Sequence, residues 1–151
     1  MGIIGKCKTV FSLDMKTLLL FIETGLYLGR IRMQLLYFPF SRIAPTLGVY
    51  LKETDSEYSQ QNHEIIFNVY QSIEIMGRNT FWETKCLVRA ITAMKMLERR
   101  QIESTLYLGT AKDENGKLIA HAWLRSGSLV VSGAEEMNRF TVTGMFAKFI
   151  Q

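Results

Sequence analysis

Up to about residue 100, apolar residues recur every three or four positions, the spacing of a helix. After that point they tend to occupy every second position, the spacing of a strand. Residues 17–40, TLLLFIETGLYLGRIRMQLLYFPF, are strongly apolar, and the pattern predicts one or two amphipathic helices that pack on the rest of the protein. Pro39 and Pro45 end or bend whatever helix runs through this segment. Charged residues interrupt the apolar run, so it falls short of the roughly 18 residues of a spanning helix, and we expect no membrane span.

Two further helices follow. Residues 63–77 have Ile66, Val69, Tyr70 and Ile73 at helical spacing, with Gly77 as a plausible stop. The stretch NTFWETKCLVRAITAMKMLERRQI then predicts a new helix. Thr80 and Glu83 fit a capping box at its start, and Thr84 is a second candidate for the N-cap. Apolar positions cover most of this helix, so we expect it to be largely buried. One stripe is expected to face water: Lys85, Arg89, Thr92, Lys95 and Arg99.

The pattern of residues in the last third of the chain predicts strands. Alternating residues and turn signals place strands at 104–111, 117–126, 128–133 and 139–146, with a turn at 113–116. Helices followed by an antiparallel meander are the order of an α+β fold. We therefore predict a buried helix, bearing Cys86, packed on a small antiparallel sheet.

Composition supports one globular unit. The 151 residues are 48% hydrophobic and include two prolines, which suits a single folded domain. The net charge of +4 is unevenly spread, since residues 1–52 hold seven Lys or Arg against two acids, and residues 53–84 hold six acids against one Arg. We interpret 1–52 as a basic, apolar helical segment packed on a core formed by 53–151. Two cysteines are too few for a disulfide framework and indicate a reducing compartment or one reactive thiol.

Cys86 is the first candidate for chemistry. It lies in the first turns of the predicted buried helix, where the helix dipole and the neighbouring Lys85 and Arg89 favour a thiolate. The alternative is that Cys86 is a small buried apolar residue, as free cysteines often are. Cys7, close to the terminus, has no such setting.

His121 is the second candidate. It lies in the middle of strand 117–126, on the face of Trp123, while Ala120 and Ala122 point to the other face and let another element approach closely. The helix that begins at Cys86 is the obvious neighbour. The other histidine, His63, opens a helix and is interpreted as a cap or surface residue.

Other classes of function lack a motif. Two histidines and two scattered cysteines give no metal-ligand spacing, and no glycine-rich phosphate loop is present, so we expect neither a metal nor a nucleotide cofactor. The basic charge suits an anionic partner, but no nucleic-acid motif accompanies it.

The order of a helix opened by cysteine and a histidine on the second following strand is that of papain-like and transglutaminase-like folds. Three local sequences, WETKCLVRA at 82–90, RRQIESTLYLG at 99–109 and AHAWL at 120–124, resemble the leader peptidases of lasso-peptide biosynthesis. The resemblance covers about residues 15–150.

The resemblance implies a cytoplasmic cysteine endopeptidase that removes the leader from a ribosomally made precursor peptide through a thioester. Cys86 would be the nucleophile, His121 the base, and backbone N–H groups at the start of the Cys86 helix the oxyanion donors. Trp82 would wall the site or simply pack in the core, and Lys85 would border it. A separate leader-recognition protein and an asparagine synthetase-like cyclase are the implied partners; a docking surface around Arg30 and Arg32 is a further hypothesis.

The third catalytic residue departs from the family pattern. Family members commonly place an aspartate about a dozen residues past the histidine, where this chain has Gly133 preceded by Ser132. Glu135 or Glu136 could reach back to the ring. A backbone carbonyl, Ser132 or an acid from elsewhere in the chain could hold the ring instead, or the chain could be weak or inactive alone. Glu135 is taken as the candidate acid. An amide transferase and a noncatalytic subunit stay open as alternative functions.

Overall fold

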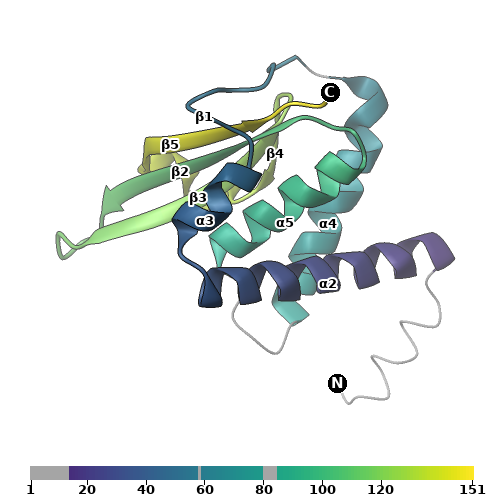
Figure 1. Ribbon diagram of the computed structural model, residues 1–151, viewed down its shortest axis with the longest axis horizontal. Coiled ribbons are helices and arrows are strands. Elements are labelled where there is room, and N and C mark those ends of the chain that lie inside the picture. Colours follow the sequence, from purple (N-terminus) through teal and green to yellow (C-terminus); the bar gives the residue numbers. More distant parts are fainter. Residues whose placement is uncertain (1–13, 58, 80–84) are drawn as a thin grey trace.

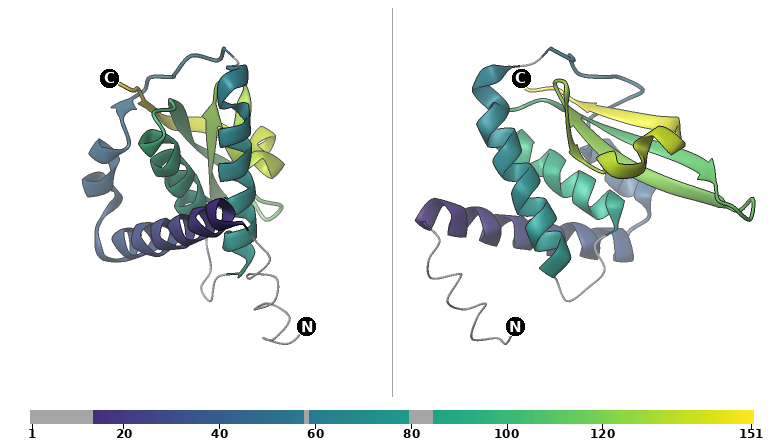
Figure 2. Two further views of the ribbon diagram at one scale, coloured as in Figure 1. Left: turned by 90° about the vertical axis from the view of Figure 1, so that its right-hand side faces the viewer. Right: turned by 180° about the vertical axis from the view of Figure 1, so that it is seen from behind.

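The computed structural model describes residues 14–57, 59–79 and 85–151. Two helices, α4 (His63–Asn79) and α5 (Cys86–Arg99), pack on one face of an antiparallel sheet, and a third, α2 (Met15–Tyr37), packs against both of them (Figure 1). A short helix, α3 (Phe40–Ile43), and two 3₁₀ turns, Ala44–Thr46 and Gln60–Asn62, connect them. A third 3₁₀ turn, η3 (Ala134–Arg139), lies on the face of the sheet away from α5 (Figure 2).

The sheet has five strands in the order β1-β5-β2-β3-β4. They are β1 (Val49–Tyr50), β2 (Ser104–Lys112), β3 (Leu118–Ser126), β4 (Leu129–Ser132) and β5 (Thr141–Lys148). All pairings are antiparallel, and Leu106 lies opposite Leu124 in the β2–β3 pair. The predicted α+β class is therefore confirmed, and strands β2 to β5 lie within two residues of their predicted positions.

The helix α5 occupies the centre of the molecule. It packs against α2, α4 and strands β2 and β3, and its apolar side chains are almost fully buried, among them Ile91, Met94 and Leu97. Burial of such side chains is the dominant favourable contribution to folding. The helix thereby holds its first residue, Cys86, in a fixed position relative to the sheet.

Two details of the prediction were wrong. Thr92 is fully buried rather than exposed to water. On either side of it along α5, Arg89 contacts α4 and Met96 contacts α2, and these two helices cover the face of α5 that carries Thr92. The helix α4 runs through Gly77 to Asn79, and a Cβ at Gly77 would lie only 2.8 Å from the Arg89 guanidinium. Glycine there makes room for a neighbour and does not end the helix.

The N-terminal segment is joined to the rest of the protein on two sides. The helix α2 contacts α4 and α5, and the two-residue strand β1, which the sequence pattern did not predict, pairs with β5. The predicted boundary between a helical segment, 1–52, and a core, 53–151, stays a prediction. Within the described ranges, no helix has both the length and the apolar character required for crossing a membrane.

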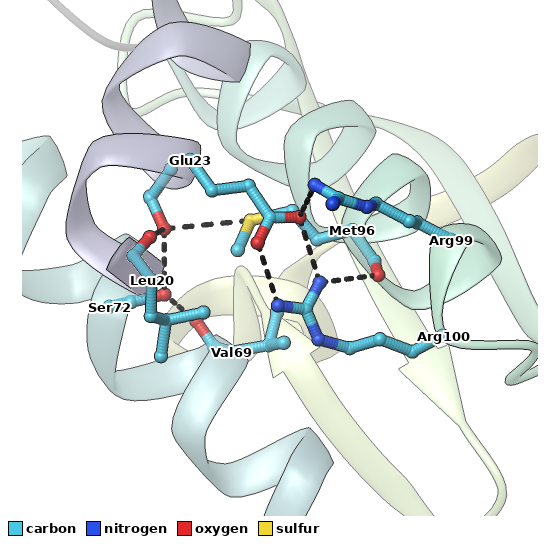
Figure 3. A network of polar contacts seen from close by, with 8 residues as sticks. Leu20, Glu23, Val69, Ser72, Met96, Arg99 and Arg100 are labelled. Carbon is cyan, nitrogen blue, oxygen red and sulfur yellow. Dashed lines mark hydrogen bonds and ion pairs between the residues drawn. The ribbon is translucent and has the colours of Figure 1, made fainter. Parts of the chain in front are cut away.

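A polar network ties α2 to the C-terminal end of α5 (Figure 3). Arg100 donates two hydrogen bonds to the Glu23 carboxylate, at 2.8 and 2.7 Å, and Arg99 lies 3.4 Å from the same group. Nearby, the buried Thr24 hydroxyl contacts Ser72 of α4 at 3.0 Å. A bidentate arginine–carboxylate pair of this kind is strong for its class because both donors are aligned.

This pair makes a specific prediction for acid stability. The hydrogen bonds from Arg100 lower the pKa of Glu23 below its ordinary value of 4.5, and the effect outweighs the opposing effect of burial. A lowered pKa in the folded state means stabilisation that is complete above about pH 5 and is lost as the pH falls. We expect Glu23→Gln to lower the free energy of unfolding by about 1–2 kcal/mol at neutral pH, with a difference that shrinks towards about pH 3.

Urea unfolding at several pH values measures this difference. Glu114→Gln, in the exposed β2–β3 turn, is the matched control and is expected to leave stability unchanged at neutral pH. A constant difference between Glu23→Gln and the parent protein over the whole range would contradict the assignment.

Candidate active site

Cys86 is the first residue of α5. Lys85 precedes it as the N-cap, in an extended conformation with φ −70° and ψ 159°, and its own side chain is exposed. Cys86 is half-buried, so its thiol is supported by the core on one side and reaches a cavity on the other. The backbone N–H groups of the first helical turn have no partner within the helix and lie beside this residue.

His121 lies at an open edge of the sheet. The strand β4 pairs with β3 only as far as Leu124 and Ser132, so among the described residues the half of β3 that carries His121 has no strand partner on that side. Alternation along β3 sends Ala122 and Leu124 into the core under α5, and His121 and Trp123 to the other face. The imidazole therefore reaches the cavity around the edge of the sheet.

The backbone carbonyl of Gly133 holds the imidazole. The distance between the His121 Nε2 atom and the Gly133 oxygen is 2.8 Å. A carbonyl oxygen only accepts hydrogen bonds, so Nε2 must carry the proton. In the neutral ring this leaves the lone pair on Nδ1, which is the atom available to take a proton.

Gly133 adopts a conformation that favours glycine. Its φ is +79°, in the left-handed region, and it precedes η3 directly. A Cβ at this position would lie 2.5 Å from the Ala122 carbonyl oxygen and 2.9 Å from the Trp123 Cβ. Glycine thus lets the chain turn off the end of β4 close against β3, and this turn aims the Gly133 carbonyl at the ring.

Aromatic side chains enclose the other sides of the imidazole. The ring centroid of His121 is 5.9 Å from that of Trp123 and 5.0 Å from that of Phe140. Trp123 stacks in turn on Tyr107, at 5.5 Å and an interplanar angle of 9°. On β2, Gly109 lies opposite His121, and a Cβ there would come within 2.9 Å of both Trp123 and Phe140. This packing restricts the rotation of the His121 ring.

A polar anchor continues this stack. The Tyr107 hydroxyl donates to Glu53 at 2.7 Å and accepts from Arg125 at 2.9 Å. Burial raises the pKa of Tyr107, and the hydrogen bond to Glu53 acts in the same direction. Arg125 also donates to the backbone oxygen of Thr54 at 3.0 Å, so the stack is fixed to the segment before α4.

One cavity, of about 280 Å³, brings the two candidates together. Cys86 and His121 both line it, and its remaining wall comes from α4, α5, β4 and the start of η3. The wall residues are Tyr70, Glu74, Arg89, Val130, Ser132, Gly133, Ala134 and Glu135. The wall is charged, with Arg89 of α5 and Glu74 of α4 separated by 3.8 Å.

The other predicted site residues are placed differently. Glu135 lines the cavity with an exposed side chain, but the His121 ring donates its hydrogen bond to the Gly133 carbonyl. Glu136 is paired with Arg139 at 3.4 Å. Lys85 is not among the residues that line the cavity, and Trp82 lies outside the described residues.

Three more predicted positions lie away from this cavity. His63 opens α4, is exposed, and stacks on Phe67. Arg30 borders a separate groove on α2, and Arg32 is a half-buried residue of the same helix.

Sequence reasoning missed Tyr70 and Glu74. Tyr70 was predicted with the core residues of its helix, yet it is exposed and lines the cavity, while Ile66, Val69 and Ile73 are buried as predicted. Tyr70 and Glu74 are four residues apart and so share one face of α4. That spacing was visible in the sequence, but nothing local showed that this face would meet the start of α5.

Comparison with known proteins gives one match. A family model described as the transglutaminase-like superfamily matches residues 27–145, a range that contains Cys86, His121 and Gly133. Searches of curated proteins and of solved structures found no significant match.

Proposed function

Because the chain belongs to the transglutaminase-like superfamily, we propose that it is a cysteine endopeptidase that removes the leader from a lasso-peptide precursor. Proteins of this superfamily are typically cysteine-dependent enzymes. The observation that carries the proposal is that Cys86 and His121 line the same cavity, although 34 residues of chain lie between them. The orientation of the ring by Gly133 adds support, since it leaves Nδ1 free to act as a base.

The first half of the proposed reaction makes a thioester. The Nδ1 atom of His121 takes the proton from the Cys86 thiol, and the sulfur attacks the carbonyl carbon at the leader–core junction. Backbone N–H groups at the start of α5 stabilise the negative charge on the carbonyl oxygen. The carbon–nitrogen bond then breaks, and the imidazolium returns its proton to the departing amine of the core peptide. The leader stays attached to Cys86 through its carboxyl end.

The second half releases the leader. His121 removes a proton from a water molecule, whose oxygen attacks the thioester carbonyl. The carbon–sulfur bond breaks, Cys86 regains a proton from His121, and the leader leaves with a free carboxyl group. Throughout, the hydrogen bond to Gly133 stays with Nε2, so the ring uses one nitrogen for chemistry and the other for position.

The finer assignment to lasso-peptide biosynthesis is supported by the local sequences around the two catalytic residues. Cys86 lies within WETKCLVRA and His121 within AHAWL, the two stretches that resemble leader peptidases of that pathway. We propose that the protein acts in the cytoplasm with a separate leader-recognition protein, and that an asparagine synthetase-like cyclase uses the amine it frees.

Amide transfer is the second candidate, because membership of the superfamily is compatible with an amine as the acceptor in place of water. The two reactions share the thioester and differ in the second nucleophile. Mass spectrometry separates them, because hydrolysis yields two fragments whose masses sum to that of the precursor plus one water, whereas transfer yields a leader carrying the added amine.

The experiment combines the protein, a lasso precursor peptide and its leader-recognition protein. We expect two fragments from hydrolysis, and none when the protein is first treated with iodoacetamide. An intact precursor under all conditions, with the alkylated and untreated samples identical, would refute the peptidase function and favour a noncatalytic role.

A further inference from the structure

The outward face of α2 is apolar and exposed. Four large apolar residues, Met15, Leu19, Ile22 and Leu26, follow one another at three- and four-residue steps along this face. Leu26 has 70% of its surface exposed, although the opposite face of the same helix is buried at Leu28 and Ile31. Single exposed apolar residues are ordinary, but a continuous row marks an interaction surface.

Three residues of this row, Leu19, Ile22 and Leu26, border a groove of about 420 Å³. Leu19, Ile22, Leu26 and Tyr27 provide its apolar wall, and Arg99 closes it from the C-terminal end of α5. We name this feature the α2 groove. Arg99 is the last residue of α5 and Cys86 the first, so the groove and the cavity lie at opposite ends of a helix about 20 Å long.

The exposed charge around the α2 groove is positive. Arg30 is exposed at its edge, and Arg99 keeps 66% of its side chain exposed. Glu23, the one acid in the wall, has only 13% of its side chain exposed and is neutralised by the bidentate pair with Arg100. An occupant therefore needs apolar side chains for the wall and negative charges for the edge.

We propose that the α2 groove docks an amphipathic helix of a separate protein, with apolar residues every three or four positions and carboxylates beside them. Helix-in-groove recognition uses this spacing of anchors. Carboxylates beside Arg30 and Arg99 supply the complementary charge, which favours fast and specific association. The proposal holds whether or not the cavity at Cys86 is catalytic, because it rests on different residues.

Other occupants fit the charge less well. A symmetric pair of copies would bring the same basic edge against itself, since a twofold interface joins identical patches. Residues 1–13 carry Lys6 and Lys8 and no acid, so they do not complement the edge either. The feature is concave, which suits inserted side chains better than the surface of a bilayer. Of the two arginines in the sequence-based docking hypothesis, Arg30 borders the groove and Arg32 is not among its lining residues.

The test uses three fluorescent helical peptides and the full-length protein. The first peptide has leucines at helical spacing flanked by glutamates, the second replaces the glutamates with lysines, and the third replaces the leucines with serines. Fluorescence anisotropy gives each Kd, and anionic phosphatidylserine vesicles and sedimentation of the protein alone test a membrane and a second copy.

We expect the acidic apolar peptide to bind at least about tenfold more tightly than the other two. Leu26→Ser and Arg30→Glu should each weaken it about tenfold, whereas Leu118→Ser, at an equally exposed leucine on the remote hairpin, and Lys117→Glu should not. Binding of all three peptides alike, or of none, overturns the proposal. So does vesicle binding or self-association that Leu26→Ser abolishes, each of which would identify a different occupant.

Discussion

Replacing Cys86 with alanine is expected to lower the rate of precursor cleavage by at least about 10³-fold while the protein stays folded. The substitution removes the sulfur atom that forms the thioester in the proposed mechanism, and no other described residue of the cavity carries a thiol. Cys86 is only half-buried, so a loss of packing does not account for a loss of this size. Single-turnover cleavage followed by mass spectrometry measures the effect, and circular dichroism checks the fold.

His121→Ala should fall to a similarly low rate, and the double variant Cys86→Ala/His121→Ala should fall no further. Residues that act as one unit in catalysis give effects that do not add. Within the described part of the chain no hydrogen bond joins the two side chains, so the proposed proton transfer requires them to move closer together in the occupied cavity. Cys7→Ala is the control for general thiol effects. Additive losses in the double variant would show that the two residues act independently.

Gly133→Ala is expected to reduce kcat/KM about 10- to 100-fold by displacing the carbonyl that orients His121. The new Cβ would lie 2.5 Å from the Ala122 oxygen, which is backbone and cannot swing away. In addition, φ at Gly133 is +79°, a region that costs an L-residue about 1–2 kcal/mol. The measurements are the kinetics of cleavage and the free energy of unfolding in urea.

Gly116 offers a matched control for the strain alone. Its φ is +77°, and a Cβ there would have no atom within 4 Å. Gly116→Ala should therefore lose a similar amount of stability, about 1 kcal/mol, with unchanged kcat/KM. Equal kinetic losses in the two variants would show that strain, rather than the position of the carbonyl, limits the rate.

A second comparison separates the Gly133 carbonyl from the candidate acid. If the carbonyl orients the ring, Glu135→Gln should keep most of the activity, because the amide preserves the size of the side chain. Nitrogen NMR of ¹⁵N-labelled histidine should show a protonated Nε2 in the neutral ring of the parent protein and a mixed tautomer in Gly133→Ala. Loss of activity in Glu135→Gln but not in Gly133→Ala would assign the orienting role to the carboxylate.

Local patterns accounted for most of the fold. The alternation around Leu118–Ser126 and the helical spacing after Cys86 predicted the correct elements, since both periods are properties of the backbone. The strand Val49–Tyr50 was missed because two residues carry no period, and its pairing with β5 depends on contacts from the far end of the chain. Thr92 was misplaced because α2 and α4 cover a side of α5 that looked polar.

The candidate site was harder to predict where it depends on the backbone. Cys86 and His121 could be singled out as side chains with suitable chemistry. The Gly133 carbonyl could not, because every residue has one and only the turn after β4 gives this one its direction. The sequence did contain a hint, since a glycine directly after a strand often marks a backbone conformation that other residues avoid.

A histidine held by a main-chain oxygen behaves differently from one held by a carboxylate. The oxygen brings no full negative charge to offset the imidazolium, and no acid in the working range can protonate it and release the ring. The Gly133 carbonyl thus stabilises the imidazolium less than a carboxylate would, but it still orients the ring when the pH falls. It also follows that no side-chain exchange at position 133 can delete the partner atom; such exchanges can only move it.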